Sequence, residues 1–201
     1  GRERIRIFIM YPHERTSRLQ ELQMISVLDP NVYNLAVRGS FDDCQAIMKA
    51  IFNDLPFKQR YQLGAVNSVN WARVLAQIVY YVYATLALDD GGRKRVSFSV
   101  PTGNFGNVLA GWIAREMGVP THSLIVGSNT NDILTRFFES QAMVADGVVP
   151  TLSPSMDIQV SSNFERLLFE MNDRDGGATA EQMAVFRSSG RMSVESDQYA
   201  R

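Results

Sequence analysis

The sequence predicts an α/β protein in which parallel strands alternate with helices that lie on both faces of a sheet. Four short runs rich in β-branched and aromatic residues, at 5–10, 32–37, 96–100 and 123–126, predict strands. Helical patterns of about ten or more residues separate these runs, which is typical of crossovers between parallel strands. Of the 201 residues, 45% are hydrophobic and 20% are charged, as in an ordinary globular protein with a packed core.

Capping patterns predict where the first helices begin. Ser17 and Gln20 form a capping box ahead of a short helix, and Ser40 can cap the next one. Asn70 precedes an apolar helix over 71–88. The uncharged part of that helix is shorter than the roughly 20 residues that span a bilayer, so we expect a buried core helix.

Further elements follow with weaker or shorter patterns. We expect a weak strand at 64–69, a helix from Asn104 or Phe105 to Arg115, a short helix at 131–140, a connector at 147–159, a helix opened by the capping box of Ser162 and Glu165, and a last helix opened by Thr179 and Gln182. The end of the chain, 188–201, is polar and shows no closing element.

Charge and cysteine content exclude several classes of partner. Lys and Arg number 20 against 21 Asp and Glu, so no basic excess is present to bind nucleic acid or an anionic membrane. Cys44 is the single cysteine, and it does not cluster with His13 or His122. We therefore expect neither a disulfide framework nor a metal site. One thiol is typical of a reducing compartment such as the cytoplasm.

The strongest local motif is the run PTGNFGN at 101–107, between an expected strand and an expected helix. Gly103 and Gly106 allow a tight turn and a close approach to a ligand. Successive N–H groups at a helix N-terminus favour phosphate, and the side chains of Asn104 and Asn107 add donors. An ordinary strand-to-helix turn has the same composition, and spacing alone does not separate the two interpretations. A dinucleotide or nucleoside triphosphate is not favoured. The run contains neither the G-x-G-x-x-G motif of dinucleotide sites nor the G-x-x-x-x-G-K-[ST] motif of nucleoside triphosphate sites.

A second polar motif, NSVNWAR at 67–73, precedes the long apolar helix. It contains two amides, a hydroxyl and the guanidinium of Arg73, which suits a phosphate or a carboxylate. The simpler interpretation makes Asn70 a helix N-cap and Arg73 a solvated residue of the first turn. The residues by themselves favour this simpler interpretation.

These segments together resemble threonine synthase. The resemblance rests on NSVNWARVLAQIVYY at 67–81, VPTGNFG at 100–106 and VPTLSPSMDIQVSSNFER at 149–166. It extends from about residue 5 to about residue 190. The family is pyridoxal-phosphate-dependent and has the tryptophan-synthase-β type of fold, known as fold type II. The resemblance implies a three-layer αβα architecture with two Rossmann-like halves and the cofactor between them. It divides the chain into a smaller α/β half at 1–69, a larger half at 70–150, and a helical extension packed on the larger half at 151–201.

The resemblance also implies the roles of individual residues. The loop that holds the cofactor phosphate in the family, here called the Gly-Asn loop, corresponds to Gly103, Asn104, Phe105, Gly106 and Asn107. The segment that faces the substrate phosphate, here called the Asn-Arg segment (67–73), carries the candidates Asn67, Ser68, Asn70 and Arg73. The implied reaction converts O-phospho-L-homoserine and water into L-threonine and phosphate with pyridoxal phosphate. The implied partner is this small-molecule substrate, with no nucleic acid and no membrane.

The Schiff-base lysine of the family is not expected within this chain. In the family that lysine lies in a Phe-Lys-Asp motif followed by Ser-Gly-Asp-Thr-Gly, and neither motif occurs here. Lys49, Lys58 and Lys94 all lie in patterns typical of solvated surface side chains. We therefore expect the central part of a threonine synthase, with no catalytic residue of its own and no turnover in isolation.

Two alternatives remain. The first is another enzyme of the same cofactor and fold type, such as a threonine dehydratase or a cysteine synthase, although the segment at 149–166 argues against it. The second is a non-catalytic phosphate-binding module of the same ancestry, which predicts that the upstream motif lacks its lysine. Asp157 and Asn163 lie in the most family-like segment, and the sequence assigns a role to neither.

Overall fold

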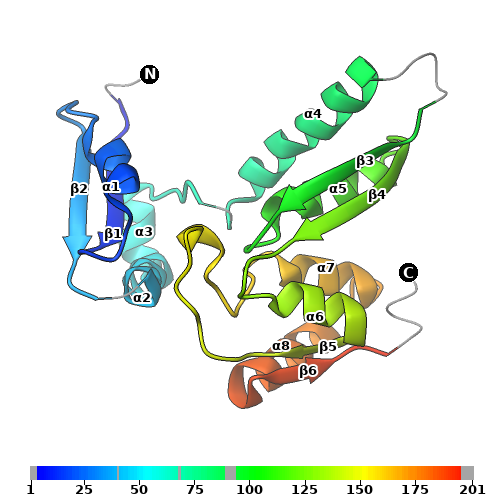
Figure 1. Cartoon of the computed structure of the whole chain (residues 1–201). Helices are drawn as coiled ribbons and strands as arrows, with labels where there is room; N and C mark the ends of the chain where they lie inside the picture. The colour runs from blue at the N-terminus through cyan, green and yellow to red at the C-terminus, as the bar shows by residue number, and fades with distance from the viewer. Residues whose placement is uncertain (1–3, 40, 68, 89–93, 196–201) are drawn as a thin grey trace. The chain divides into compact units, whose positions relative to one another are not determined.

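The computed structural model describes residues 4–39, 41–67, 69–88 and 94–195 (Figure 1). Contacts between Cα atoms divide the chain into two compact units, Gly1–Gly64 and Ala65–Arg201, called here the first and the second unit. The expected boundaries at residues 69 and 150 stay a proposal about the complete protein.

The first unit is built around a small parallel sheet. Its strands are β1 (Ile7–Pro12) and β2 (Val32–Val37), with helix α1 (Arg18–Ile25) between them in the chain. Two further helices follow, α2 (Phe41–Asn53) and α3 (Leu55–Tyr61). Both strands and their parallel pairing are as the sequence predicts.

Local capping explains where the helices of the first unit begin. The Ser17 hydroxyl oxygen accepts the N–H of Gln20 at 3.3 Å, which confirms Ser17 as the N-cap of α1. Ser40, the expected cap of α2, lies outside the described residues. Helix α3 begins at Leu55, with Pro56 in its first turn. The Asp54 carboxylate accepts the N–H of Phe57 at 3.0 Å, and proline is well tolerated in a first helical turn.

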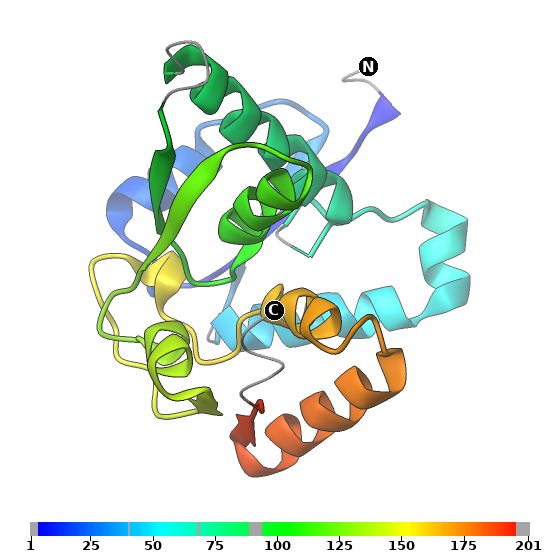
Figure 2. The ribbon, with the colours of Figure 1, turned by 90° about the vertical axis from the view of Figure 1, so that its right-hand side faces the viewer.

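The second unit contains a second parallel pair, β3 (Val96–Pro101) and β4 (Thr121–Gly127), with α5 (Gly106–Glu116) as the crossover. Helix α4 (Trp71–Leu88) precedes β3 and packs on α5. Figure 2 shows α5 lying along β4. This arrangement confirms the α/β class and the small parallel sheets.

The helices α4 and α5 cover one face of this sheet. The ring of Tyr81 in α4 meets that of Phe98 in β3 edge-on, with 4.8 Å between the centroids. A Cβ on Gly111 of α5 would lie 2.6 Å from the Tyr81 ring and 3.0 Å from Leu124 of β4. The opposite face carries exposed side chains, namely Ser97, Ser99 and Ile125. Helices on both faces remain a proposal for the complete protein.

Helix α4 is buried along one side only, in contrast to the expected core helix. Its buried side chains are Val74, Ile78, Tyr81 and Thr85. Its exposed apolar side chains include Leu75, Val79, Tyr83 and Leu86. By length and composition, α4 is the one helix among the described residues that could cross a membrane, although part of it is packed inside this unit.

The rest of the second unit follows β4. Its elements are α6 (Ile133–Ser140), β5 (Ala142–Val144), the 3₁₀ helix η2 (Pro154–Met156), α7 (Phe164–Met171), α8 (Gly176–Ser189) and β6 (Arg191–Ser193). The strands β5 and β6 form an antiparallel pair beside α8 (Figure 1), with Met143 opposite Met192. The expectation of a polar end without a closing element is therefore wrong, because β6 pairs and Val194 is buried.

Two other expectations are corrected. No strand occupies 64–67 or 69, where the described backbone forms an irregular turn ahead of α4. Helix α8 begins three residues before Thr179, because the Asp175 carboxylate accepts the N–H groups of Gly177 and Ala178 at 2.8 and 3.0 Å. Thr179 is buried inside the helix and donates its hydroxyl to the Asp175 carbonyl at 2.7 Å.

Candidate functional site

The Gly-Asn loop leads from β3 into the N-terminus of α5. The N–H of Leu109 donates to the Phe105 carbonyl at 2.9 Å, which is the first hydrogen bond of the helix. The N–H groups of Gly106, Asn107 and Val108 therefore have no acceptor within α5. These three donors and the positive end of the helix dipole favour an anion at this position.

Phe105 holds the loop in place through its ring. Its backbone is left-handed, with φ of 60°, a conformation that is uncommon for a non-glycine residue. The ring is only 3% exposed and lies 6.1 Å, centroid to centroid, from both Phe138 of α6 and Phe164 of α7. Burial of this ring against two helices offsets the cost of the strained backbone.

Gly103 is required by packing within the chain. A Cβ at this position would lie 3.0 Å from the Met156 Cα and 3.2 Å from the Ser155 carbonyl oxygen. Both of these are backbone atoms of η2 and cannot move aside cheaply. The sequence pattern explains Gly103 by the close approach of a ligand. In the structure, the connector itself approaches Gly103 closely.

Asn104 is held by the start of α7. The N–H and the side-chain amide of Asn163 donate to the Asn104 carbonyl at 3.2 and 2.9 Å. The Ser162 hydroxyl donates to the Asn104 side-chain oxygen at 3.2 Å. The expected capping box of Ser162 and Glu165 is therefore wrong. The N-cap is Asn163, which is fully buried and makes no side-chain capping bond.

Asn107 is tied to α4 rather than left free for a ligand. The Tyr81 hydroxyl lies 2.7 Å from the Asn107 side-chain oxygen and 2.9 Å from its carbonyl, so both oxygens share one donor. Burial raises the pKa of Tyr81 to about 12, which keeps this hydroxyl protonated at neutral pH. The Asn107 side-chain nitrogen donates to the Gln77 side-chain oxygen at 3.4 Å, so α4 engages both the oxygen and the nitrogen of this side chain.

In the Asn-Arg segment, the polar side chains mostly bind the local backbone. The Asn70 oxygen accepts the N–H of Ala72 at 3.0 Å, so Asn70 caps α4 as the simpler interpretation has it. The Asn67 oxygen accepts the N–H of Val69 at 3.1 Å. Ser68 lies outside the described residues. Arg73 is exposed, and one of its nitrogens donates to the Val66 carbonyl at 3.1 Å. Its remaining N–H groups can serve an anion.

Arg166 of α7 joins the Asn-Arg segment to the Gly-Asn loop. Its Nη2 donates to the Val69 carbonyl at 2.7 Å, and its Nη1 makes a short hydrogen bond to the Asn163 side-chain oxygen. The guanidinium carbon lies 5.6 Å from the centre of the Trp71 ring. Burial lowers the pKa of Arg166, although nearby Glu165 favours the charged form. Sequence patterns assign no role to Arg166 or Asn163, because their partners are distant in the chain.

Asp157 organises the connector that supports the loop. Its carboxylate accepts the side-chain amide of Asn129 and the hydroxyl of Thr151, both at 2.7 Å. It also accepts the N–H of Thr151 at 2.8 Å and the side-chain amide of Asn131 at 3.1 Å. Burial by itself would raise the pKa of Asp157, but these donors hold it below its ordinary value. Asp157 therefore has a structural role next to η2, which contacts Gly103.

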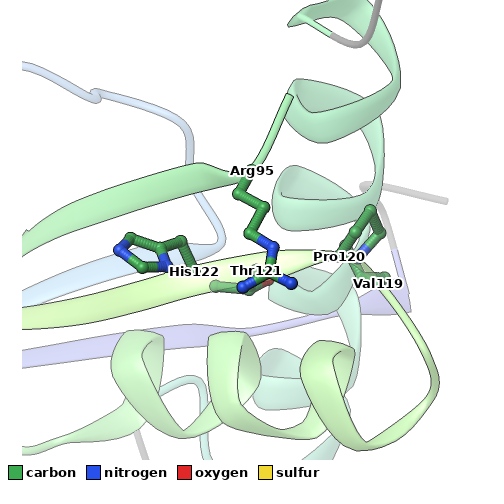
Figure 3. Close-up of a pocket in the computed structure, with 5 residues that line it drawn as sticks. All are labelled: Arg95, Val119, Pro120, Thr121 and His122. Carbon is green, nitrogen blue, oxygen red and sulfur yellow. The ribbon is translucent and has the colours of Figure 1, made fainter. Parts of the chain in front are cut away.

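Two cavities lie at opposite ends of the β3–β4 pair. One of about 410 Å³ lies between α4 and β3 and reaches the Gly-Asn loop; its lining includes Tyr80, Tyr81, Pro101 and Asn107. The other, of about 280 Å³, is lined by Arg95, Val119, Pro120, Thr121 and His122 (Figure 3). Because the strands are parallel, this second cavity at their starts lies away from the loop at their ends.

All three lysines lie outside the Gly-Asn loop and the Asn-Arg segment in the sequence. Lys49 and Lys94 are exposed, and the amine of Lys58 lies 5.6 Å from the centre of the Phe52 ring. Within the described residues, no group of three or more His, Cys, Asp or Glu side chains could hold a metal ion.

Comparisons with known proteins agree on one family. No protein-family model matches the chain. It is 52% identical over 197 residues to the threonine synthase of Pseudomonas aeruginosa, covering 98% of this chain and 42% of that enzyme. It is 51% identical over 171 residues to the threonine synthase of Saccharomyces cerevisiae, covering 84% of this chain and 33% of that enzyme.

Solved structures give the same result. The chain superposes on the pyridoxal-phosphate-bound threonine synthase of Brucella melitensis with a TM-score of 0.88 and 48% identity, covering all of this chain and 43% of that one. For threonine synthase of Escherichia coli the TM-score is 0.74 at 36% identity, over 84% of this chain and 40% of that one. The chain thus spans about two fifths of the length of these relatives. It is a threonine synthase homologue and corresponds to a portion of that enzyme.

Proposed function

We propose that the full-length protein carrying this chain is a threonine synthase, a carbon–oxygen lyase that acts on a phosphate ester. It converts O-phospho-L-homoserine and water into L-threonine and phosphate with pyridoxal phosphate. The observation that carries the proposal is the 48% identity and TM-score of 0.88 to a cofactor-bound threonine synthase over the whole chain. The proposal includes two α/β halves with helices on both faces of their sheets, and a cytoplasmic location.

The cofactor phosphate is assigned to Gly103, Asn104, Phe105, Gly106 and Asn107. The N–H groups that have no acceptor within α5 fit this role, and the contacts of Asn104 with α7 and of Asn107 with α4 hold the loop in shape. When bound, the coenzyme supplies an electron sink for bond changes at the amino-acid carbons. The tasks of this chain are therefore to hold the phosphate end and to orient the ring.

The substrate phosphate is assigned to Asn67, Ser68, Asn70 and Arg73. Arg73 supports this assignment because its guanidinium is exposed and retains donors beyond its contact with Val66. Charge grows on the leaving phosphate as its bond to carbon breaks, and a positioned guanidinium stabilises that charge. The amine that moves protons is assigned to a lysine outside this chain, so we expect the chain in isolation to show no turnover.

Assays of the full-length protein test the reaction. Incubation with O-phospho-L-homoserine and pyridoxal phosphate should release phosphate and L-threonine in equal amounts. A parallel incubation contains L-threonine in place of the phosphate ester. Release of ammonia from L-threonine, with no threonine formed from O-phospho-L-homoserine, would indicate a dehydratase. Absence of every product would favour a non-catalytic phosphate-binding module.

The role of Arg73 has its own test. In the full-length protein, Arg73→Ala should raise the KM for O-phospho-L-homoserine by roughly tenfold or more, the usual scale for loss of a charge-assisted hydrogen bond. The dissociation constant for pyridoxal phosphate should change less. Arg115→Ala is the matched control, because Arg115 lies in the last turn of α5, at the end away from the Gly-Asn loop, and its ion pair among the described residues is with Glu116 at 3.7 Å. Equal losses of substrate and cofactor binding would give Arg73 a structural or cofactor-binding role.

A further inference from the structure

Arg166 and Asn163 belong to neither set of assigned binding residues, yet they connect the two. Asn163 donates twice to the Asn104 carbonyl of the Gly-Asn loop, at 3.2 and 2.9 Å. Its side-chain oxygen accepts from Arg166, whose other terminal nitrogen donates to the Val69 carbonyl at 2.7 Å. A continuous series of hydrogen bonds therefore runs between segments that lie about 35 residues apart in the sequence.

The chemistry of these side chains makes the connection rigid. Asn163 is 0% exposed and uses its N–H, its amide nitrogen and its amide oxygen in the series. The guanidinium of Arg166 is planar, so its two terminal nitrogens fix the separation of the two acceptors. The Trp71 ring, 5.6 Å from the guanidinium carbon, further restricts its position.

The Val69 carbonyl is a sensitive point in the Asn-Arg segment. Val69 lies between Ser68 and Asn70 in the sequence. Its own N–H is held by the Asn67 side chain at 3.1 Å, and the N–H of Arg73 donates to the Asn70 carbonyl at 3.0 Å. A shift of the Val69 carbonyl would therefore disturb the positions of Asn67, Asn70 and Arg73.

We propose that Arg166 is a positioning residue that sets the Asn-Arg segment relative to the Gly-Asn loop, acting through Asn163 on one side and the Val69 carbonyl on the other. The inference rests on the proposed function, in which these two segments hold the substrate phosphate and the cofactor phosphate. Arg166 would then set the separation of two anions without contacting either of them.

Hydrogen–deuterium exchange on the full-length apoprotein tests this positioning without turnover. Arg166→Met should speed exchange at residues 69–73 by about threefold or more, because the Val69 carbonyl loses its partner. Exchange around residues 105–109 should stay within twofold, since Asn163 still holds Asn104. The matched control is Arg187→Met, which removes another arginine contact to α7, the 3.3 Å pair with Glu165. Arg187→Met should leave the exchange rates at residues 69–73 and 105–109 unchanged.

Arg166→Lys covers the case in which Arg166→Met does not fold. Lysine keeps the positive charge but places it on one nitrogen, which cannot repeat the two-nitrogen bridge. It should produce the same local increase in exchange at 69–73. If exchange there stays within twofold of wild type in every variant that folds, or rises equally throughout the second unit, the inference is overturned, whether or not the protein makes threonine. A selective rise supports it even in a protein that makes none.

Steady-state kinetics provide the second test. Arg166→Met should raise the KM for O-phospho-L-homoserine by about fivefold or more, with kcat and the pyridoxal phosphate dissociation constant within about twofold. In the double variant with Arg73→Ala, the fold increase in KM should be well below the product of the two single increases, because both changes disturb the same segment. The inference is overturned if Arg166→Met impairs KM, kcat and the pyridoxal phosphate dissociation constant equally. It is also overturned if the KM increase of the double variant equals the product of the two single increases, because Arg166 would then have an independent structural role.

Discussion

Tyr81 links α4 to the Gly-Asn loop through a single hydroxyl. That hydroxyl donates to Asn107, and the ring packs against Phe98 and against the surface of Gly111. The side chain is 3% exposed, so loss of the hydroxyl leaves two oxygens of Asn107 without this donor. The contact is local in space, but its partners are 26 residues apart in the chain.

Replacement of Tyr81 by phenylalanine should destabilise the protein. Tyr81→Phe is expected to lower the free energy of unfolding by about 1–2 kcal/mol, measured by urea denaturation at pH 7. Tyr80→Phe is the matched control, because the Tyr80 side chain is 60% exposed and its change should stay within about 0.5 kcal/mol. Similar effects of the two variants would mean that the hydrogen bond to Asn107 adds nothing to stability.

The raised pKa of Tyr81 predicts a loss of stability at alkaline pH. Burial raises the pKa of Tyr81 to about 12 in the folded chain, whereas the phenol of an unfolded chain has its ordinary pKa of about 10. This contribution is therefore fully present below pH 10 and is lost as the pH rises towards 12. Denaturation between pH 10 and 12 should show a steeper decline for wild type than for Tyr81→Phe. Parallel declines would contradict the burial of this phenol.

Asp157 predicts the opposite dependence on pH. Its lowered pKa gives a stability contribution that is present above the ordinary pKa of about 3.8 and is lost as the pH falls through the lower folded value. Asp157→Asn should cost about 2 kcal/mol at pH 7, because an amide nitrogen would face the donors of Thr151 and Asn129. The gap between variant and wild type should narrow towards pH 3. Glu181→Gln, on an exposed side of α8, is the control and should show no gap at either pH.

At the scale of elements, the close approach of α4 and α5 depends on one small residue. A Cβ on Gly111 would lie 2.6 Å from the Tyr81 ring, well inside contact distance. The ring cannot rotate freely, because its hydroxyl is held by Asn107 and it meets the Phe98 ring edge-on. An added methyl group must therefore push the two helices apart.

Gly111→Ala should accordingly be destabilising although alanine favours helices. We expect a loss of about 1–3 kcal/mol in the free energy of unfolding, the usual cost of overpacking. Gly147→Ala is the control, since a Cβ there has no atom within 4 Å among the described residues. A neutral or stabilising Gly111→Ala would show that the helix pair can separate at no cost.

Elements were predictable from sequence where the pattern is local. Ser17 and Asn70 cap helices as their sequence positions indicate, because a cap involves residues only two or three apart. The three-residue strands β5 and β6 are too short to show an alternating pattern. The capping box at Ser162 failed because its hydroxyl binds Asn104, 58 residues away, and a distant partner leaves no local signal.

At the scale of the whole molecule, the proposed cofactor site predicts a linkage between binding and stability. At about one hundred times its dissociation constant, pyridoxal phosphate should raise the free energy of unfolding of the full-length protein by about 2.7 kcal/mol. Arg73→Ala should retain most of this gain, because Arg73 is assigned to the substrate. Thermal or urea unfolding with and without the coenzyme measures it. Unchanged stability would mean that the folded protein does not bind the coenzyme.

The sequence alone was sufficient for the α/β class, the strands β1 to β4 and the resemblance to threonine synthase. Each of these depends on residues that are close together in the chain or on the order of residues in long motifs. The tertiary structure decided what Gly103, Asn163 and Arg166 contact: the backbone of Met156, the Asn104 carbonyl and the Val69 carbonyl. Folding brings these groups together from distant segments, and contacts of that kind leave no periodicity or spacing in the sequence.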